Sequence, residues 1–120
     1  MAVVNWLDKQ PRSSIWITSI TVLEIQFGLQ ILPDGKRKRK LFDSFEALMQ
    51  EINQRIAPFD AVAAERAGDL MAQRQKTGRP VELRDTMIAG IVTSHRASLA
   101  TRNTSHFEDL ALPVINPWVL

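Results

Sequence analysis

Apolar residues recur at helical spacing along several stretches of this 120-residue chain. The clearest pattern covers residues 38–52, where apolar side chains recur at steps of three and four and predict an amphipathic helix. Four further helices are predicted over residues 2–10, from Thr18 or Ser19 to about residue 32, from the cap Asp60 to residue 75, and over residues 83–95. Because the second of these is apolar on two sides, we expect it to be largely buried.

Short apolar runs between these helices predict strands at residues 15–17, 55–59, 98–101 and 114–115. Buried strands that alternate with helices are typical of a parallel sheet with helices on both faces. We therefore expect one α/β domain over residues 1–120, a three-layer sandwich in which a short parallel sheet is flanked by helices. In such folds the functional site lies beyond the carboxyl ends of the strands.

Composition and charge narrow the classes of protein that fit. The hydrophobic fraction of 45% is enough for a core, and the absence of cysteine excludes disulfides and thiolate metal sites. No apolar run approaches the roughly 20 residues that span a bilayer, and the first residues do not resemble a signal peptide. We expect a cytoplasmic protein with no membrane contact. The net charge of +2 includes a basic run at residues 36–40, which is more simply a solvated helix start than a phosphate contact.

Two acidic residues lie where a buried helix face is expected. Glu24 stands in mid-helix among apolar residues, where a carboxylate must be paired, protonated or bound to a metal. Partial exposure or an ion pair with an arginine is the simpler explanation for it. Asp85 stands in the first turn of its helix, where backbone amides favour any carboxylate. Since Ile88, Ala89 and Val92 share its side, we expect Asp85 to point over the sheet.

Asn103 directly follows the strand at residues 98–101, at the end where a parallel sheet places its site. A plain turn or cap is its simpler role. Together with Glu24 and Asp85 it suits Mg²⁺, which prefers oxygen ligands and assists phosphate hydrolysis. Two histidines are too few for a zinc signature, and the sequence contains no phosphate-binding glycine loop, serine elbow or metalloprotease helix.

Three segments carry a resemblance to a known family: TVLEIQFG, GRPVELRDTMIAG, and LATRN followed by FEDL and LPVINPW. In this order they resemble PIN-domain toxins of the VapC and FitB kind, over essentially the whole chain. The resemblance implies a metal-dependent endoribonuclease of a type II toxin–antitoxin system that binds Mg²⁺ or Mn²⁺. The family's metal-binding glutamate and aspartate match Glu24 and Asp85, and the position after the next strand matches Asn103. The implied partners are an RNA substrate, a cognate antitoxin and a second copy in a homodimer.

The chain departs from the family pattern in two places. The family begins with an apolar strand that ends in an aspartate, and we expect this first strand to be missing, because Asp8 falls too late to replace that aspartate. His106 stands where relatives often carry another acid. Two explanations stay open for the truncation: a true start upstream of Met1, which we prefer because the other motifs are intact, and a decayed toxin.

Two functions also remain open. In the leading hypothesis this chain is a truncated form of a toxin-like ribonuclease, either active or inactivated by the truncation, in which Glu24 and Asp85 hold the metal and Asn103 positions a water or a phosphate. The candidate RNA contacts are three arginines: Arg79, Arg84 and Arg102. The alternative is a non-catalytic PIN-like module that binds an antitoxin or associates with itself. An assay of Mg²⁺-dependent RNA cleavage by this chain and by one extended upstream separates the two.

Overall fold

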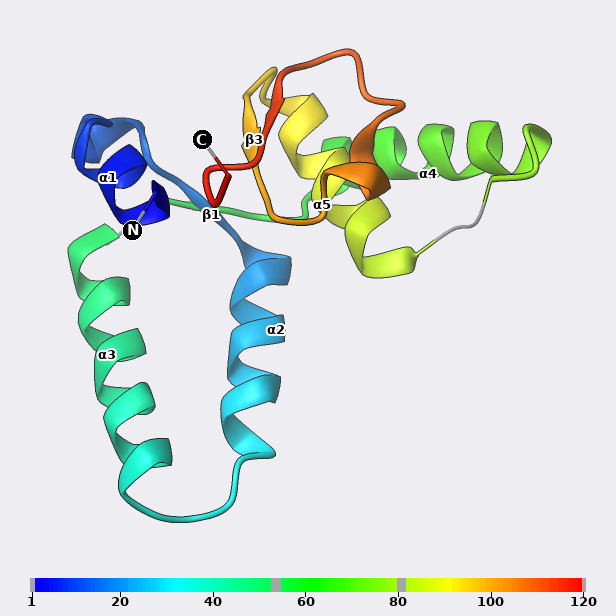
Figure 1. Cartoon of the computed structure of the whole chain (residues 1–120). Helices are drawn as coiled ribbons and strands as arrows, with labels where there is room; N and C mark the ends of the chain where they lie inside the picture. The colour runs from blue at the N-terminus through cyan, green and yellow to red at the C-terminus, as the bar shows by residue number, and fades with distance from the viewer. Residues whose placement is uncertain (1, 53–54, 80–81, 120) are drawn as a thin grey trace.

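The computed structural model describes residues 2–52, 55–79 and 82–119 (Figure 1). In chain order the elements are α1 (Ala2–Asp8), a 3-10 helix η1 (Arg12–Ser14), β1 (Ile17–Thr18), α2 (Ser19–Gln30), α3 (Lys36–Ile52), β2 (Ile56–Ala57), α4 (Ala61–Lys76), α5 (Leu83–Ser94), β3 (Leu99–Ala100), a 3-10 helix η2 (Thr104–Phe107) and β4 (Val114–Ile115). The predicted α/β order of helices and strands is confirmed. None of the helices in these ranges is long and apolar enough to cross a membrane.

All the strand pairs are parallel, as predicted. Ile17 lies opposite Ile56 where β1 pairs with β2, and Leu99 lies opposite Val114 where β3 pairs with β4. The two pairs form separate two-stranded sheets, whereas the sequence had predicted a single short sheet. The reason is that each strand is only two residues long and no strand of the described ranges bridges the two pairs.

Helices α4 and α5 pack closely and form the main body of the molecule together with η2. Ala63 and Ala89 are fully buried, and Phe107 from η2 joins the same core cluster. A Cβ atom on Gly90 of α5 would lie 2.4 Å from the carbonyl oxygen of Ala63 on α4. The two backbones therefore approach so closely that only glycine fits at the crossing.

Local capping fixes where the helices begin and end. The Thr18 and Asp60 side chains accept hydrogen bonds from the Thr21 and Ala63 backbone N–H groups, so both predicted caps are confirmed. Helix α4 ends in a Schellman turn, in which Gly78 has a φ of 70° and the next N–H, of Arg79, bonds to the Arg74 carbonyl. This turn directs the chain back toward η2.

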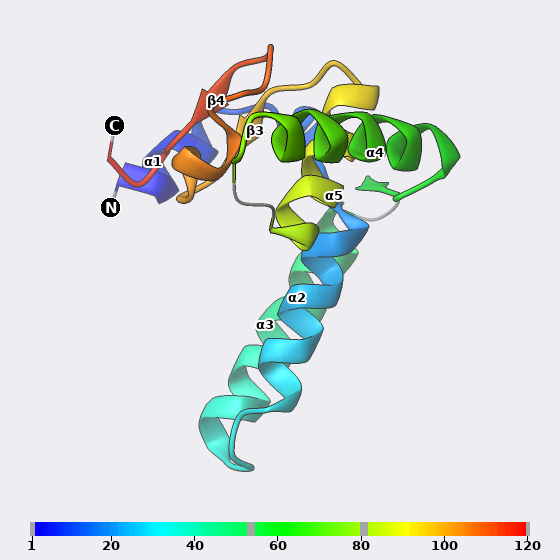
Figure 2. The ribbon, with the colours of Figure 1, turned by 90° about the vertical axis from the view of Figure 1, so that its right-hand side faces the viewer.

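Helices α2 and α3 form a hairpin that projects from this body, as the two perpendicular views show (Figures 1 and 2). Only Ile20 and Leu29 are buried in α2, and only Ile52 in α3. The prediction that α2 is largely buried was wrong. Because the hairpin stands apart from the core, only one side of each helix finds a neighbour, and residues such as Phe27 remain exposed.

Candidate functional site

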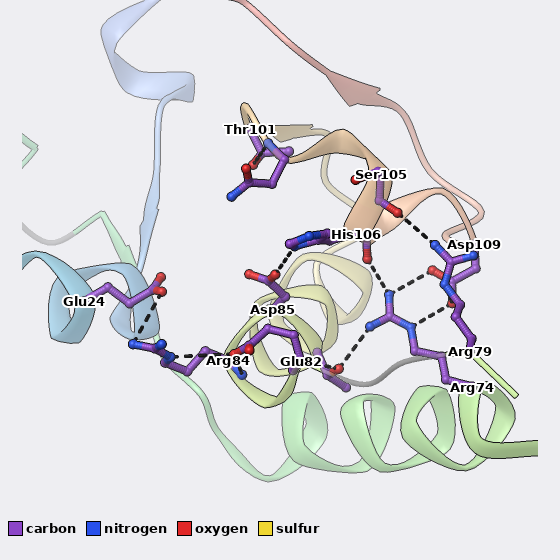
Figure 3. A network of polar contacts seen from close by, with 12 residues as sticks. Glu24, Arg74, Arg79, Glu82, Arg84, Asp85, Thr101, Ser105, His106 and Asp109 are labelled. Carbon is purple, nitrogen blue, oxygen red and sulfur yellow. Dashed lines mark hydrogen bonds and ion pairs between the residues drawn. The ribbon is translucent and has the colours of Figure 1, made fainter.

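Glu24 lies in the second turn of α2, on the side that faces the start of α5 (Figure 3). Its side chain keeps 35% of its exposure, and its Oε2 atom lies 3.9 Å from the Arg84 Nη1 atom. The Arg84 guanidinium also lies 3.7 Å from Glu82, so it bridges two carboxylates. Partial exposure and an arginine partner, the simpler explanation of Glu24, thus describe this carboxylate in the free protein.

Asp85 lies in the first turn of α5, as predicted, and its side chain is only 14% exposed. Its Oδ2 atom is hydrogen-bonded to His106 Nδ1 at 2.5 Å, so α5 is joined to η2 at this point. In Figure 3 the carboxyl groups of Glu24 and Asp85 both point into the space between α2 and α5. Two of the three predicted site residues therefore face the same space.

Asn103 immediately precedes η2, and its exposed side chain makes no capping hydrogen bond there. The local hydrogen bonds are made by its backbone instead. The Asn103 N–H donates to Thr101 Oγ1 at 3.1 Å, and the Asn103 carbonyl accepts from the His106 N–H at 3.1 Å. The Asn103 amide is consequently available to a ligand. It belongs to the same short segment as the histidine that contacts Asp85.

The donor set at this place suits a hard divalent cation in kind. Mg²⁺ is commonly held by one or two carboxylates and completes its shell with water and substrate phosphate. Glu24 and Asp85 provide two such carboxylates. No three His, Asp or Glu side chains gather in a metal-binding arrangement anywhere in residues 2–52, 55–79 and 82–119. A cation bound here would therefore depend on these two carboxylates and on solvent or phosphate oxygens.

The three arginines predicted to meet RNA have different surroundings. The Arg84 side chain is half exposed beside Glu24. Arg102 lies over the Trp118 ring, with its guanidinium carbon 4.6 Å from the ring centroid. Arg79 already donates to the Ser105 carbonyl at 2.9 Å, so fewer of its donors are free.

A buried arginine beside the site was not predicted. Arg74 on α4 is 2% exposed, and its guanidinium chelates the Asp109 carboxylate with two hydrogen bonds of 2.8 Å. It also donates to Thr86 Oγ1 and to the His106 carbonyl (Figure 3). One signal in the sequence could have revealed it: Arg74 continues the apolar stripe of α4 that contains Ala63 and Ala67.

The network changes the titration of Asp109. Hydrogen bonds from Arg74 hold the pKa of the Asp109 carboxyl below its ordinary value of 3.8, and the positive charges of Arg74 and Arg79 act in the same direction. Partial burial opposes them, because it disfavours the charged form. Asp109 thus stays ionised and supplies the counter-charge for a cation that the fold has removed from water.

Comparisons with known proteins identify the family of this chain. The PIN domain family matches residues 1–112 of this chain. The VapC ribonuclease Y4jK of Sinorhizobium fredii is 37% identical over 118 residues, which are 98% of this chain and 84% of that protein. The toxin FitB of Neisseria gonorrhoeae is 31% identical over 97% of this chain and 84% of its own length.

A solved structure supports the fold independently. The crystal structure of FitAcB from Neisseria gonorrhoeae superposes with a TM-score of 0.90 at 30% sequence identity, and the match covers 98% of this chain and 85% of the solved one. The parallel α/β fold of this chain is therefore the fold of that solved structure. The chain belongs to the PIN domain family, and its homologues include VapC and FitB toxins.

Proposed function

We propose that this chain, as one domain over residues 1–120, is a toxin-like, metal-dependent endoribonuclease of a type II toxin–antitoxin system. The observation that carries the proposal is the pair formed by Glu24 and Asp85, which reach one space from two different helices. Relatives named as a ribonuclease and as a toxin match nearly the whole chain, which supports both parts of the proposal.

The site residues have two proposed roles, to hold the metal ion and to orient a water or a phosphate. Glu24 and Asp85 would hold Mg²⁺ or Mn²⁺, which supplies an activated water and stabilises the negative charge that builds on a phosphate. Asn103 would orient a water or a phosphate oxygen through its free amide. The Asp85 carboxylate is held in place by its hydrogen bond to His106, so its orientation is set before any ligand arrives.

The RNA backbone would meet the arginines around this space. Arg84 is the foremost candidate, since a cation that takes over Glu24 frees the guanidinium for a phosphate. Arg102 lies over the Trp118 ring and could contact a second phosphate. Arg79 contributes mainly charge, because its donors are partly committed to Ser105.

The proposed partners follow from the exposed surface and the relatives. Apolar side chains on α2 and at its C-cap, namely Leu23, Phe27 and Ile31, are more than half exposed and offer a surface to another protein chain. We assign this surface to an antitoxin and to a second copy in a homodimer. A toxin that cleaves RNA acts in the cytoplasm, which is where we place the protein.

Cleavage of RNA by the purified chain tests the proposal. We expect cleavage in Mg²⁺ and none after the metal is chelated. Glu24→Gln and Asp85→Asn should each slow cleavage about a hundredfold or more, as expected when stabilisation of developing charge is lost. Glu46→Gln, which neutralises an exposed glutamate on α3, is the matched control and should cleave normally. Normal cleavage by both site variants would show that the ligands are misassigned.

A second function is favoured by one observation: in the free protein Glu24 is paired with Arg84, and no three acidic or histidine side chains of the described residues are arranged to hold a metal. In that case the chain is a non-catalytic PIN-like module that binds an antitoxin or itself. A chain that leaves RNA intact in Mg²⁺ and in Mn²⁺, yet dimerises in sedimentation, would establish this second function in place of the first.

A further inference from the structure

A positive charge lies almost entirely out of water beneath the candidate site. Arg74 points inward from the apolar stripe of α4, and only 2% of the residue is exposed. A charge in such a place is tolerated only when it is paired and its donors are satisfied. A buried charge does not contribute to the solubility of α4. The burial of the Arg74 guanidinium therefore needs a structural explanation.

The partners of Arg74 come from three separate parts of the chain. Its Nε and Nη2 atoms chelate the Asp109 carboxylate, which follows η2. Its Nη1 atom donates to Thr86 Oγ1 at 3.0 Å, on α5. Its Nη2 atom donates a further hydrogen bond of 2.7 Å to the backbone carbonyl of His106, in η2. The planar fork of an arginine can make all these bonds at once, which a lysine ammonium cannot.

Two of these partners adjoin the Asp85–His106 pair directly. Thr86 follows Asp85 in the chain, and its hydroxyl, which accepts from Arg74, donates to the Glu82 carbonyl at 2.8 Å. The His106 carbonyl belongs to the same residue whose Nδ1 atom bonds to Asp85. Arg74 therefore contacts both sides of the pair: the Thr86 hydroxyl on α5 and the His106 backbone carbonyl on η2.

We propose that Arg74 is a positioning residue, which through Thr86, Asp109 and the His106 carbonyl holds the His106 ring against the Asp85 carboxylate. An ionised carboxylate can only accept, so His106 Nδ1 donates and the Nε2 atom is left for solvent or a ligand. The significance of this for RNA cleavage rests on the proposed function. The placement of the His106 ring does not, and it can be measured without RNA or metal.

Nitrogen NMR of the histidine rings provides the test. The chain contains only two histidines, and the exposed His95 serves as an internal reference. In the Arg74→Lys variant we expect the His106 ring nitrogens to lose the signature of an Nδ1–H hydrogen bond and to move toward the His95 values. Asp85→Asn should produce a change of the same kind, because it alters the acceptor itself.

Arg55→Lys is the matched control. Arg55 also donates from its guanidinium to backbone carbonyls, those of Ile15 and Glu51, but it ties β2 to the segment before β1. A purely structural arginine at position 74 predicts equal behaviour of the two variants, with His106 undisturbed in both. Unchanged His106 signals in folded Arg74→Lys would overturn the proposal. If that variant does not fold, Asp109→Asn, which weakens the chelation but preserves shape, applies the same criterion.

RNA cleavage gives the second measurement. Loss of a residue that orients a site commonly lowers activity about 10- to 100-fold, and we expect kcat to fall by this factor in Arg74→Lys while KM stays constant. A wild-type chain that cleaves no RNA would refute the proposed function, and the ring signals would still decide the role of Arg74. Conversely, if the wild-type chain cleaves RNA and the His106 signals are unchanged in Arg74→Lys, the positioning role alone is refuted.

Discussion

The α4–α5 body and the α2–α3 hairpin are each built from two helices but bury their apolar side chains to different extents. In the body, Ala63 and Ala89 are completely buried and Gly90 lets the two backbones touch. In the hairpin, Phe27 and Ile31 lie mostly in solvent. Both regions contain large apolar side chains, so the difference in burial arises from which neighbours each helix has in the fold.

Polar contacts differ in the same way. The body encloses Arg74 in a network with Asp109, whereas the hairpin has an ion pair between Lys38 and a fully exposed Asp34. The candidate site lies where the two regions meet, because Asp85 belongs to the body and Glu24 to the hairpin. The separation of the two carboxylates therefore depends on how the hairpin is held against the body.

The largest expected difference between the regions concerns two phenylalanines. Phe107 is 2% exposed in the core and Phe27 is 58% exposed on α2. Phe107→Ala should lower the free energy of unfolding by about 3 to 5 kcal/mol, because it removes apolar burial and leaves a cavity. Phe27→Ala should change it by less than about 0.5 kcal/mol. Urea unfolding of both variants measures the difference, and comparable losses would show that the hairpin is covered in solution.

A second comparison concerns the acidic residues of the two ion pairs. The pKa of Asp109 is lowered in the folded protein, so its ionised form stabilises the fold above the ordinary value of 3.8. This contribution is lost as the pH falls through the lowered pKa. We expect Asp109→Asn to be less stable than the wild type at neutral pH. The difference in stability between the two should shrink as the pH falls into the acid range.

The control for this prediction is Asp34→Asn, which removes the exposed partner of Lys38. A surface ion pair of this kind contributes little to stability. The unfolding temperature of the variant should therefore equal that of the wild type at every pH. Thermal unfolding between about pH 2 and pH 7 covers the relevant range. A constant gap for Asp109→Asn across that range would mean that its ionisation does not stabilise the fold.

The sequence predicted the elements well because caps and periodicity are local. Thr18, Asp60 and the first-turn position of Asp85 all depend on neighbours a few residues away. Whether α2 is buried depends on where the hairpin points, and this is settled by contacts that no local pattern contains. The expectation for α2 failed for that reason.

The candidate site shows the same limit. Glu24 and Asp85 were identified from their chain positions, but the pairing of Glu24 with Arg84 and of Asp85 with His106 required the fold. Arg74 was overlooked because its partners lie 12 to 35 residues away along the chain. An arginine on an otherwise apolar helix stripe is the local sign of such a network.

The last comparison concerns two glycines, one in each region. An alanine at position 90 would place its Cβ against the Ala63 carbonyl oxygen and the Ala67 Cβ, at 2.4 and 2.8 Å, so the two helices must separate. We expect Gly90→Ala to destabilise the fold by about 1 to 3 kcal/mol. Gly28 on α2 has nothing within 4 Å of a built Cβ, and Gly28→Ala should stabilise by about 0.5 to 1 kcal/mol through helix propensity alone. Opposite shifts in the urea midpoint would support the contrast, whereas a loss at Gly28 would indicate that α2 packs against a second chain in solution.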